Sequence, residues 1–123
     1  MALEFEDLTE KIIGAAIEVH KGLGPGFLES VYENALVLEL RKRGLSFEQQ
    51  KEVLIKYDGT DVGKHRLDLF IEDEIVADLK TVTELLDVHF AVVRSQLRAV
   101  KRKHGLLLNF AKAKLEAKRV ISN

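Results

Sequence analysis

The spacing of apolar residues changes period twice along this chain, and this most constrains the fold. Apolar residues recur at helical spacing over about 8–21 and 28–43, alternate with polar residues from 47 to 81, and return to helical spacing over about 83–103. A chain with both periods is neither all-helical nor all-β. The pattern predicts a mixed α/β fold with a central sheet flanked by helices.

The alternating region predicts three successive antiparallel strands. They cover 47–57, 65–71 and 75–81, and the turns between them are Asp58-Gly59 and Glu72-Asp73-Glu74. Alternation in the second strand predicts one face of Leu67, Leu69 and Ile71, opposed by a face of Arg66, Asp68 and Phe70.

Glycines and a final apolar run complete the expected order. Gly22 or Gly24 would end the first helix, Gly44 the second and Gly105 the third. Residues 106–110 read as a buried strand, and a weaker strand is expected near 115–121. The predicted order is α-α-β-β-β-α-β(-β), in a single domain over 1–123.

The net charge of −1 conceals a strong asymmetry. Residues 94–119 hold nine Lys and Arg against one acid, Glu116, whereas residues 1–93 hold ten bases and nineteen acids. One interpretation is a basic face for a phosphate-rich partner, and the other is a solvated face whose charges pair across the fold.

Residue usage excludes several classes of protein. The chain has no cysteine, which excludes disulfide frameworks, thiolate metal sites and a cysteine nucleophile. Its first ten residues carry four acids and no apolar run, so no signal peptide is expected. No apolar segment approaches the ~20 residues of a membrane span. We therefore expect a cytoplasmic protein without a membrane partner.

Three charged residues interrupt otherwise apolar strands: Asp68, Asp78 and Lys80. Asp68 and Asp78 each lie five residues from Asp73, which places them opposite one another if that turn joins their strands. Opposed carboxylates are unfavourable unless a cation lies between them, and Mg²⁺ prefers such oxygen ligands. Lys80 could then hold a water or stabilise phosphate charge. The alternative is a structural Asp–Lys ion pair without metal.

Other candidate residues also allow two interpretations. Glu29 could be a third carboxylate at the same metal, or a helix N-terminal acid favoured by the macrodipole. Tyr32 shares the helix face of Glu29 and could be either a site residue or a core ring. His89 could be a ligand or phosphate contact, or structural.

An ordered set of motifs resembles a known family. Gly26-Phe27-Leu28-Glu29-Ser30-Val31-Tyr32 matches Gly-x-x-Glu-x-x-Tyr, and Arg66-Leu67-Asp68, Asp78-Leu79-Lys80, His89-Phe90-Ala91, the run from Gly105 to Phe110 and Lys118-Arg119 follow in order. Together these resemble the GxxExxY protein family, which is grouped with the PD-(D/E)XK nuclease superfamily.

The resemblance implies a fold and a chemistry. It implies an α-β-β-β-α-β core in which Asp68, Asp78, Glu29 and the backbone carbonyl of Leu79 bind Mg²⁺ or Mn²⁺, and Lys80 positions the attacking water. The reaction would be hydrolysis of phosphodiester bonds in nucleic acid, with DNA favoured over RNA, and the protein could act as a homodimer. A basic stripe would bind the substrate backbone, namely Arg94, Arg98, Lys101 and Arg102.

The chain departs from the family pattern in two places. Asp78 stands where the family usually has Glu, and Val92 and Gln96 stand where Gln and Tyr are expected. Val92 removes a polar residue from the helix that faces the site in many superfamily members. The alternative function is therefore a non-catalytic nucleic-acid-binding or protein-interaction module that retains the nuclease fold.

Overall fold

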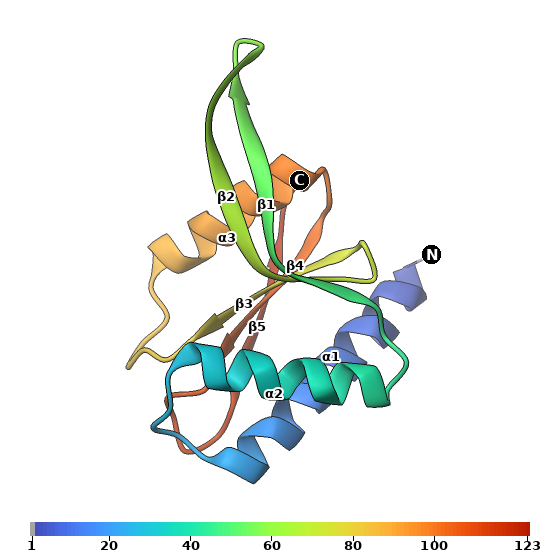
Figure 1. The fold of residues 1–123 in the computed structure, drawn as a ribbon, viewed down its shortest axis with the longest axis vertical. Helices are drawn as coiled ribbons and strands as arrows, with labels where there is room; N and C mark the ends of the chain where they lie inside the picture. Colours follow the sequence, from blue (N-terminus) through green and yellow to red (C-terminus); the bar gives the residue numbers. More distant parts are fainter. Residues whose placement is uncertain (1) are drawn as a thin grey trace.

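The computed structural model describes residues 2–123, with side chains from residue 5 onward. Three helices and five strands follow the predicted order (Figure 1). They are α1 (Ala2–Leu23), α2 (Glu29–Lys42), β1 (Phe47–Tyr57), β2 (Thr60–Ile71), β3 (Ile75–Lys80), α3 (Asp87–Val100), β4 (His104–Asn109) and β5 (Glu116–Ile121).

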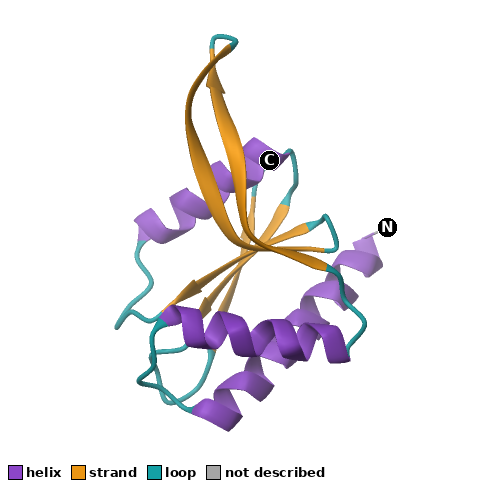
Figure 2. Ribbon diagram, in the orientation of Figure 1, coloured by secondary structure: helices purple, strands orange, loops and turns teal. Residues whose placement is uncertain are grey.

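The five strands form one mixed sheet in the order β1-β2-β3-β4-β5. The expected meander of β1, β2 and β3 is confirmed, because both strand pairs are antiparallel. β3 and β4 are parallel, and α3 makes the crossover between them. The β1–β2 hairpin extends well beyond the rest of the sheet (Figure 2). The structure is thus the mixed α/β fold that the sequence predicts.

Helices cover both faces of the sheet. Apolar residues of α1 and α2, including Ile12, Tyr32 and Leu36, pack on one face against residues such as Leu69 and Leu108. A second, smaller cluster on the opposite face joins α3 to the sheet through Val93, Leu97, Leu67, Phe70 and Val76. Burial of these two clusters fixes the sheet between its helices.

The predicted faces of β2 are wrong on one side of Asp68. Leu69 and Ile71 pack under α1 and α2, but Leu67 packs on the α3 face together with Phe70. The change coincides with Gln50, whose φ of 51° is left-handed: the β1–β2 register continues past this position, but Gln50 and Asp68 opposite it are not paired. The alternation of side chains between the two sheet faces therefore breaks at Asp68.

The expected end of the third helix is also wrong. The helix stops at Val100, because Lys101 adopts a left-handed conformation with φ of 59°. Gly105 instead lies inside β4, where α3 comes close to the sheet. A Cβ at this position would lie 2.8 Å from Val93 Cγ1 and 3.1 Å from the Val76 carbonyl oxygen. Gly105 is thus required for close packing rather than for helix termination.

Candidate nuclease site

Asp68 and Asp78 meet where β2 separates from β3. The last regular pair of this ladder is Leu69 with Ala77, so Asp68 and Asp78 are the next residues along the two strands. The Asp68 carboxylate accepts a hydrogen bond from the Leu79 backbone N–H at 2.9 Å. A side chain thus satisfies a strand N–H at the point where the strands diverge. The juxtaposition predicted from the turn at Asp73 is present.

Asp78 is buried beside two charged neighbours. Its residue is 6% exposed, and Lys80 Nζ lies 3.1 Å from its Oδ2. Burial raises the pKa of the Asp78 carboxyl from 3.8 to about 7, a hydrogen bond with Asp68 and the charge of Asp68 act in the same direction, and Lys80 opposes them. The fold therefore holds this carboxyl in an environment that disfavours its charged form.

The carboxylate oxygens at the divergence of β2 and β3 suit a divalent cation. Within the described part of the chain, Asp78 Oδ2 is buried without a hydrogen-bond partner, and its charged neighbour is Lys80 Nζ at 3.1 Å. An unsatisfied buried carboxylate oxygen next to a second carboxylate is unfavourable by itself, and hard cations such as Mg²⁺ prefer such oxygens. Asp68 and Asp78 fit a cation of this type.

Glu29 is not brought into this cluster. It is the first residue of α2 and its side chain is exposed. Across residues 5–123, whose side chains are described, no three Asp, Glu or His residues come close enough to share a metal ion. The position of Glu29 agrees with an acid favoured by the helix macrodipole, and its role as a third ligand stays a prediction.

The Gly-x-x-Glu-x-x-Tyr segment covers the end of the loop before α2 and the first turn of that helix. The Tyr32 hydroxyl donates to the Gly24 carbonyl at 2.6 Å and accepts from the Phe27 N–H at 3.2 Å. Its ring is buried and stacks on Phe110 at 4.4 Å between centroids. Gly26 has a φ of 113°, which favours glycine. Tyr32 thereby fixes the loop that leads into Glu29.

Replacement of Tyr32 by Phe should destabilise the protein without emptying the core. The variant keeps the stacked ring but leaves the Gly24 carbonyl and Phe27 N–H without this partner, which should lower the free energy of unfolding by about 1–3 kcal/mol. Urea unfolding measures the change. Tyr57 is 74% exposed, so Tyr57→Phe serves as the control and should stay within about 0.5 kcal/mol of wild type. Equal losses in the two variants would contradict this role of Tyr32.

His89 caps the N-terminus of α3. Its ring Nδ1 accepts a hydrogen bond from the Leu86 backbone N–H at 2.9 Å, and the backbone N–H of His89 donates to the Leu86 carbonyl at 2.9 Å. This reciprocal bonding agrees with the structural alternative for His89, and its role as a ligand or phosphate contact stays a prediction. On the same helix, Val92 is 37% exposed, whereas Gln96 is 6% exposed and its Oε1 has no hydrogen-bond partner among the described residues.

Glu33 is a buried acid that the sequence reasoning missed. It is 7% exposed, and its two oxygens accept hydrogen bonds from the side-chain amides of Gln49 at 2.9 Å and Gln50 at 2.8 Å. These bonds tie α2 to β1 at the position across the ladder from Asp68. The two adjacent strand glutamines, Gln49 and Gln50, were only a weak signal of a buried acid, because nothing in the sequence indicated that they bond to a residue of α2.

The predicted basic stripe is only partly free for a ligand. Arg94, Arg98 and Lys101 are exposed on or next to α3. Arg102 is half-buried, donates to the Asp73 carbonyl at 2.7 Å, and forms an ion pair with the Asp73 carboxylate at 3.0 Å. Arg102 therefore holds the β2–β3 turn against the end of α3.

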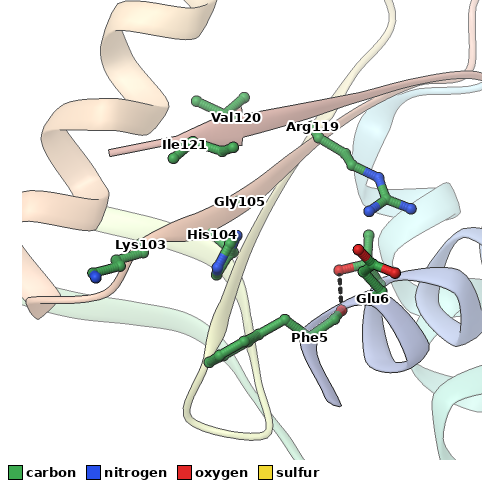
Figure 3. A pocket seen from close by; sticks show the side chains of 9 residues that line it. Phe5, Glu6, Lys103, His104, Gly105, Arg119, Val120 and Ile121 are labelled. Carbon is green, nitrogen blue, oxygen red and sulfur yellow. Dashed lines mark hydrogen bonds between the residues drawn. The ribbon is translucent and has the colours of Figure 1, made fainter. Parts of the chain in front are cut away.

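The cavity in Figure 3 lies away from the carboxylates. It has a volume of about 440 Å³ and is lined by residues of α1, β4 and β5, including Phe5, His104 and Arg119. In the parallel β3–β4 ladder, His104 pairs with Ile75, whereas Lys80 pairs with Asn109 at the other end. The cavity is thus at the opposite end of the sheet from Asp78 and Lys80.

Comparison with known proteins places the chain in a family. Residues 6–120 match the PD-(D/E)XK nuclease superfamily. The structure titled "Crystal structure of SSO0001" has the same fold, with a TM-score of 0.64 and 17% sequence identity. The match covers 98% of this chain and 61% of that one. A comparison with curated proteins found no match. Separately, no helix in the described residues is long and apolar enough to span a bilayer.

The family match over residues 6–120, nearly the whole sequence, shows that the chain belongs to the PD-(D/E)XK nuclease superfamily.

Proposed function

We propose that this protein is a divalent-metal-dependent nuclease that hydrolyses phosphodiester bonds in nucleic acid, with DNA preferred over RNA. The observation that carries the proposal is the buried, unsatisfied Asp78 oxygen, which lies beside Lys80 and next to Asp68 at the divergence of two strands. Superfamily membership supports the same chemistry. The Gly26, Glu29 and Tyr32 motif supports assignment to the GxxExxY group within it.

Asp68 and Asp78 would hold Mg²⁺ or Mn²⁺, with the Leu79 carbonyl and Glu29 as further candidate ligands. When bound, such a cation would stabilise charge on the phosphate and make a coordinated water more acidic. Lys80 has a side chain that is 24% exposed, so its ammonium can reach a ligand while it stays next to Asp78. It would orient the attacking water and donate hydrogen bonds to the phosphate oxygens as negative charge develops.

The reaction would be hydrolysis of one phosphodiester bond by one water molecule. The water oxygen attacks phosphorus, the bond from phosphorus to one ester oxygen breaks, and that oxygen leaves with a proton. The exposed cations Arg94, Arg98 and Lys101 would bind neighbouring phosphates, and Arg102 would contribute mainly by holding the turn at Asp73.

A cleavage panel tests the proposal. Plasmid, linear duplex, single-stranded DNA, a four-way junction and RNA are incubated with Mg²⁺, Mn²⁺ or EDTA. We expect cutting of at least one substrate with either metal and none in EDTA. Absence of cutting under every condition would contradict the proposal.

The second candidate is a non-catalytic nucleic-acid-binding module. The ion pair between Lys80 and Asp78 favours it, because this pair partly compensates the buried carboxylate without a metal. Such a module would bind nucleic acid with strong salt dependence but leave every substrate of the panel intact.

A further inference from the structure

A groove separates the β1–β2 hairpin from α3. It has a volume of about 500 Å³, and its walls come from both elements. The hairpin contributes Leu54, Ile55, Lys56 and His65, and the helix side contributes Ser95, Arg98, Ala99 and Lys101. The lining contains three cationic side chains and one histidine, and among the described residues it contains no acid. Its charge therefore suits an anionic ligand.

A hydrogen-bond chain fixes the histidine in this groove. The Ser95 hydroxyl donates to the Val92 carbonyl at 2.7 Å, so it has no second proton to give. His65 Nε2 lies 2.8 Å from the same hydroxyl oxygen and must therefore be the donor. His65 consequently keeps a proton on Nε2, and its other nitrogen, Nδ1, is not needed for this contact.

The outward face of the hairpin differs from the groove face. There Glu52 forms ion pairs with Lys64 at 3.4 Å and with Arg66 at 2.9 Å, so cations on that side are compensated. On the groove side, Lys56 pairs with Asp61 at 2.6 Å, whereas Arg98 and Lys101 form no ion pair with any acid whose side chain is described. The uncompensated cations that line the groove are thus Arg98 and Lys101, on its helix side.

The groove leads toward the carboxylate pair. His65 and Asp68 are three residues apart on β2, which corresponds to about 10 Å along a strand. Leu67, between them, packs on the α3 face, and so does Val76, which shares a strand face with Asp78. The groove and the buried Asp78 carboxylate therefore lie on the same side of the sheet.

The size of the groove selects a single strand. Its volume lies in the range of ~300–1,000 Å³ that small-molecule pockets have, which is enough for one or two nucleotides. A double helix is wider than its own major groove of about 12 Å and is too large to be enclosed in this volume. A single strand can place phosphates against Arg98 and Lys101 and leave its bases outside.

We propose that this groove binds the backbone of a single nucleic-acid strand and leads that strand to Asp68 and Asp78. The inference rests on the proposed function, and it specifies the substrate as a single-stranded segment or a strand that is unpaired next to the cleavage position. Gly63 supports it, since its cross-strand partner Ile55 lines the groove and a Cβ at Gly63 would meet open space.

Two variants and two matched controls test the groove. Arg98→Ala removes a cation, and Gly63→Glu adds a carboxylate without backbone strain, because a Cβ at Gly63 has no contact within 4 Å and its φ is not positive. Lys42→Ala removes an exposed cation from α2, and Gly22→Glu adds the same charge at an equally open position in α1. Neither control residue lines the groove.

Binding is measured by fluorescence anisotropy with a labelled 12-nucleotide single strand in EDTA. We expect wild type to bind this strand at least ~10-fold more tightly than the matched duplex, and Arg98→Ala and Gly63→Glu to raise Kd roughly three- to tenfold at low salt. The controls should remain within about twofold. Duplex binding that is equal or tighter, or equal losses in controls and groove variants, would overturn the inference.

Cleavage kinetics separate the inference from the proposed function. Both hold if cutting occurs and Arg98→Ala raises KM with kcat nearly unchanged. If cutting occurs but KM is insensitive to Arg98→Ala and Gly63→Glu, the groove inference is wrong and the nuclease proposal stands. If the groove variants weaken binding but nothing is cut, the groove binds a strand and the nuclease proposal is wrong.

Discussion

Replacement of Lys80 by Ala should abolish metal-dependent cleavage while the protein stays folded. Loss of one donor that stabilises transition-state charge typically lowers kcat by about 10²–10³. The Lys80 side chain is only 24% exposed, and its ammonium lies 3.1 Å from the Asp78 carboxylate. Initial rates on the best substrate of the cleavage panel measure the effect, and circular dichroism checks the fold.

Lys64→Ala is the control for this experiment. Lys64 lies on β2, in the β1–β2 hairpin, but its side chain is 59% exposed and it pairs with Glu52 on the outward face. This variant should cut at nearly the wild-type rate. If Lys80→Ala also cuts at the wild-type rate, Lys80 is only a structural partner of Asp78.

Asp78→Asn should stabilise the metal-free protein at neutral and higher pH. The pKa of Asp78 is about 7 in the fold and 3.8 in its ordinary state. As pH rises from 4 to 7, the unfolded chain releases this proton before the folded chain does, so the group lowers folding stability across this window. At pH 8 the effect is complete, and the uncharged Asn avoids it.

The expected gain is large because one pKa unit corresponds to about 1.4 kcal/mol. With an allowance for the lost Lys80 ion pair, the variant should melt roughly 5–10 °C above wild type at pH 8 without metal. The difference should vanish near pH 4. Mg²⁺ should raise the melting temperature of wild type but not of the variant.

Asp58→Asn is the matched control for the stability experiment. Asp58 is exposed in the β1–β2 turn, with a φ of 55° that Asn tolerates well. Its melting temperature should follow wild type at every pH. A clear fall in melting temperature for Asp78→Asn at pH 8 would show that Asp78 is a structural ion-pair partner of Lys80.

The sequence predicted much of the fold because its periods are strong. The element order, the meander and the turn at Asp58-Gly59 follow from local signals, and all are present. The placement of Asp68 next to Asp78 followed from residue counting across one short turn. Register across a tight turn depends on few residues, so such a count is dependable.

Tertiary contacts decided the features that the sequence did not predict. The reversal of faces at Asp68 coincides with the left-handed Gln50, and a period-two pattern assumes a regular strand. Gly105 does not end the helix; it allows close packing of Val93, which lies twelve residues away in the sequence. The burial of Glu33 depends on glutamines of another element. None of these has a local signal.

The most direct test of the central claim is a Mn²⁺ titration followed by electron paramagnetic resonance. If Asp68 and Asp78 form the metal site, wild type binds Mn²⁺ saturably at pH 8, and Asp68→Asn and Asp78→Asn weaken binding at least ~10-fold, while Asp58→Asn binds as wild type. Binding that is absent in wild type, or unchanged in both site variants, would contradict the account.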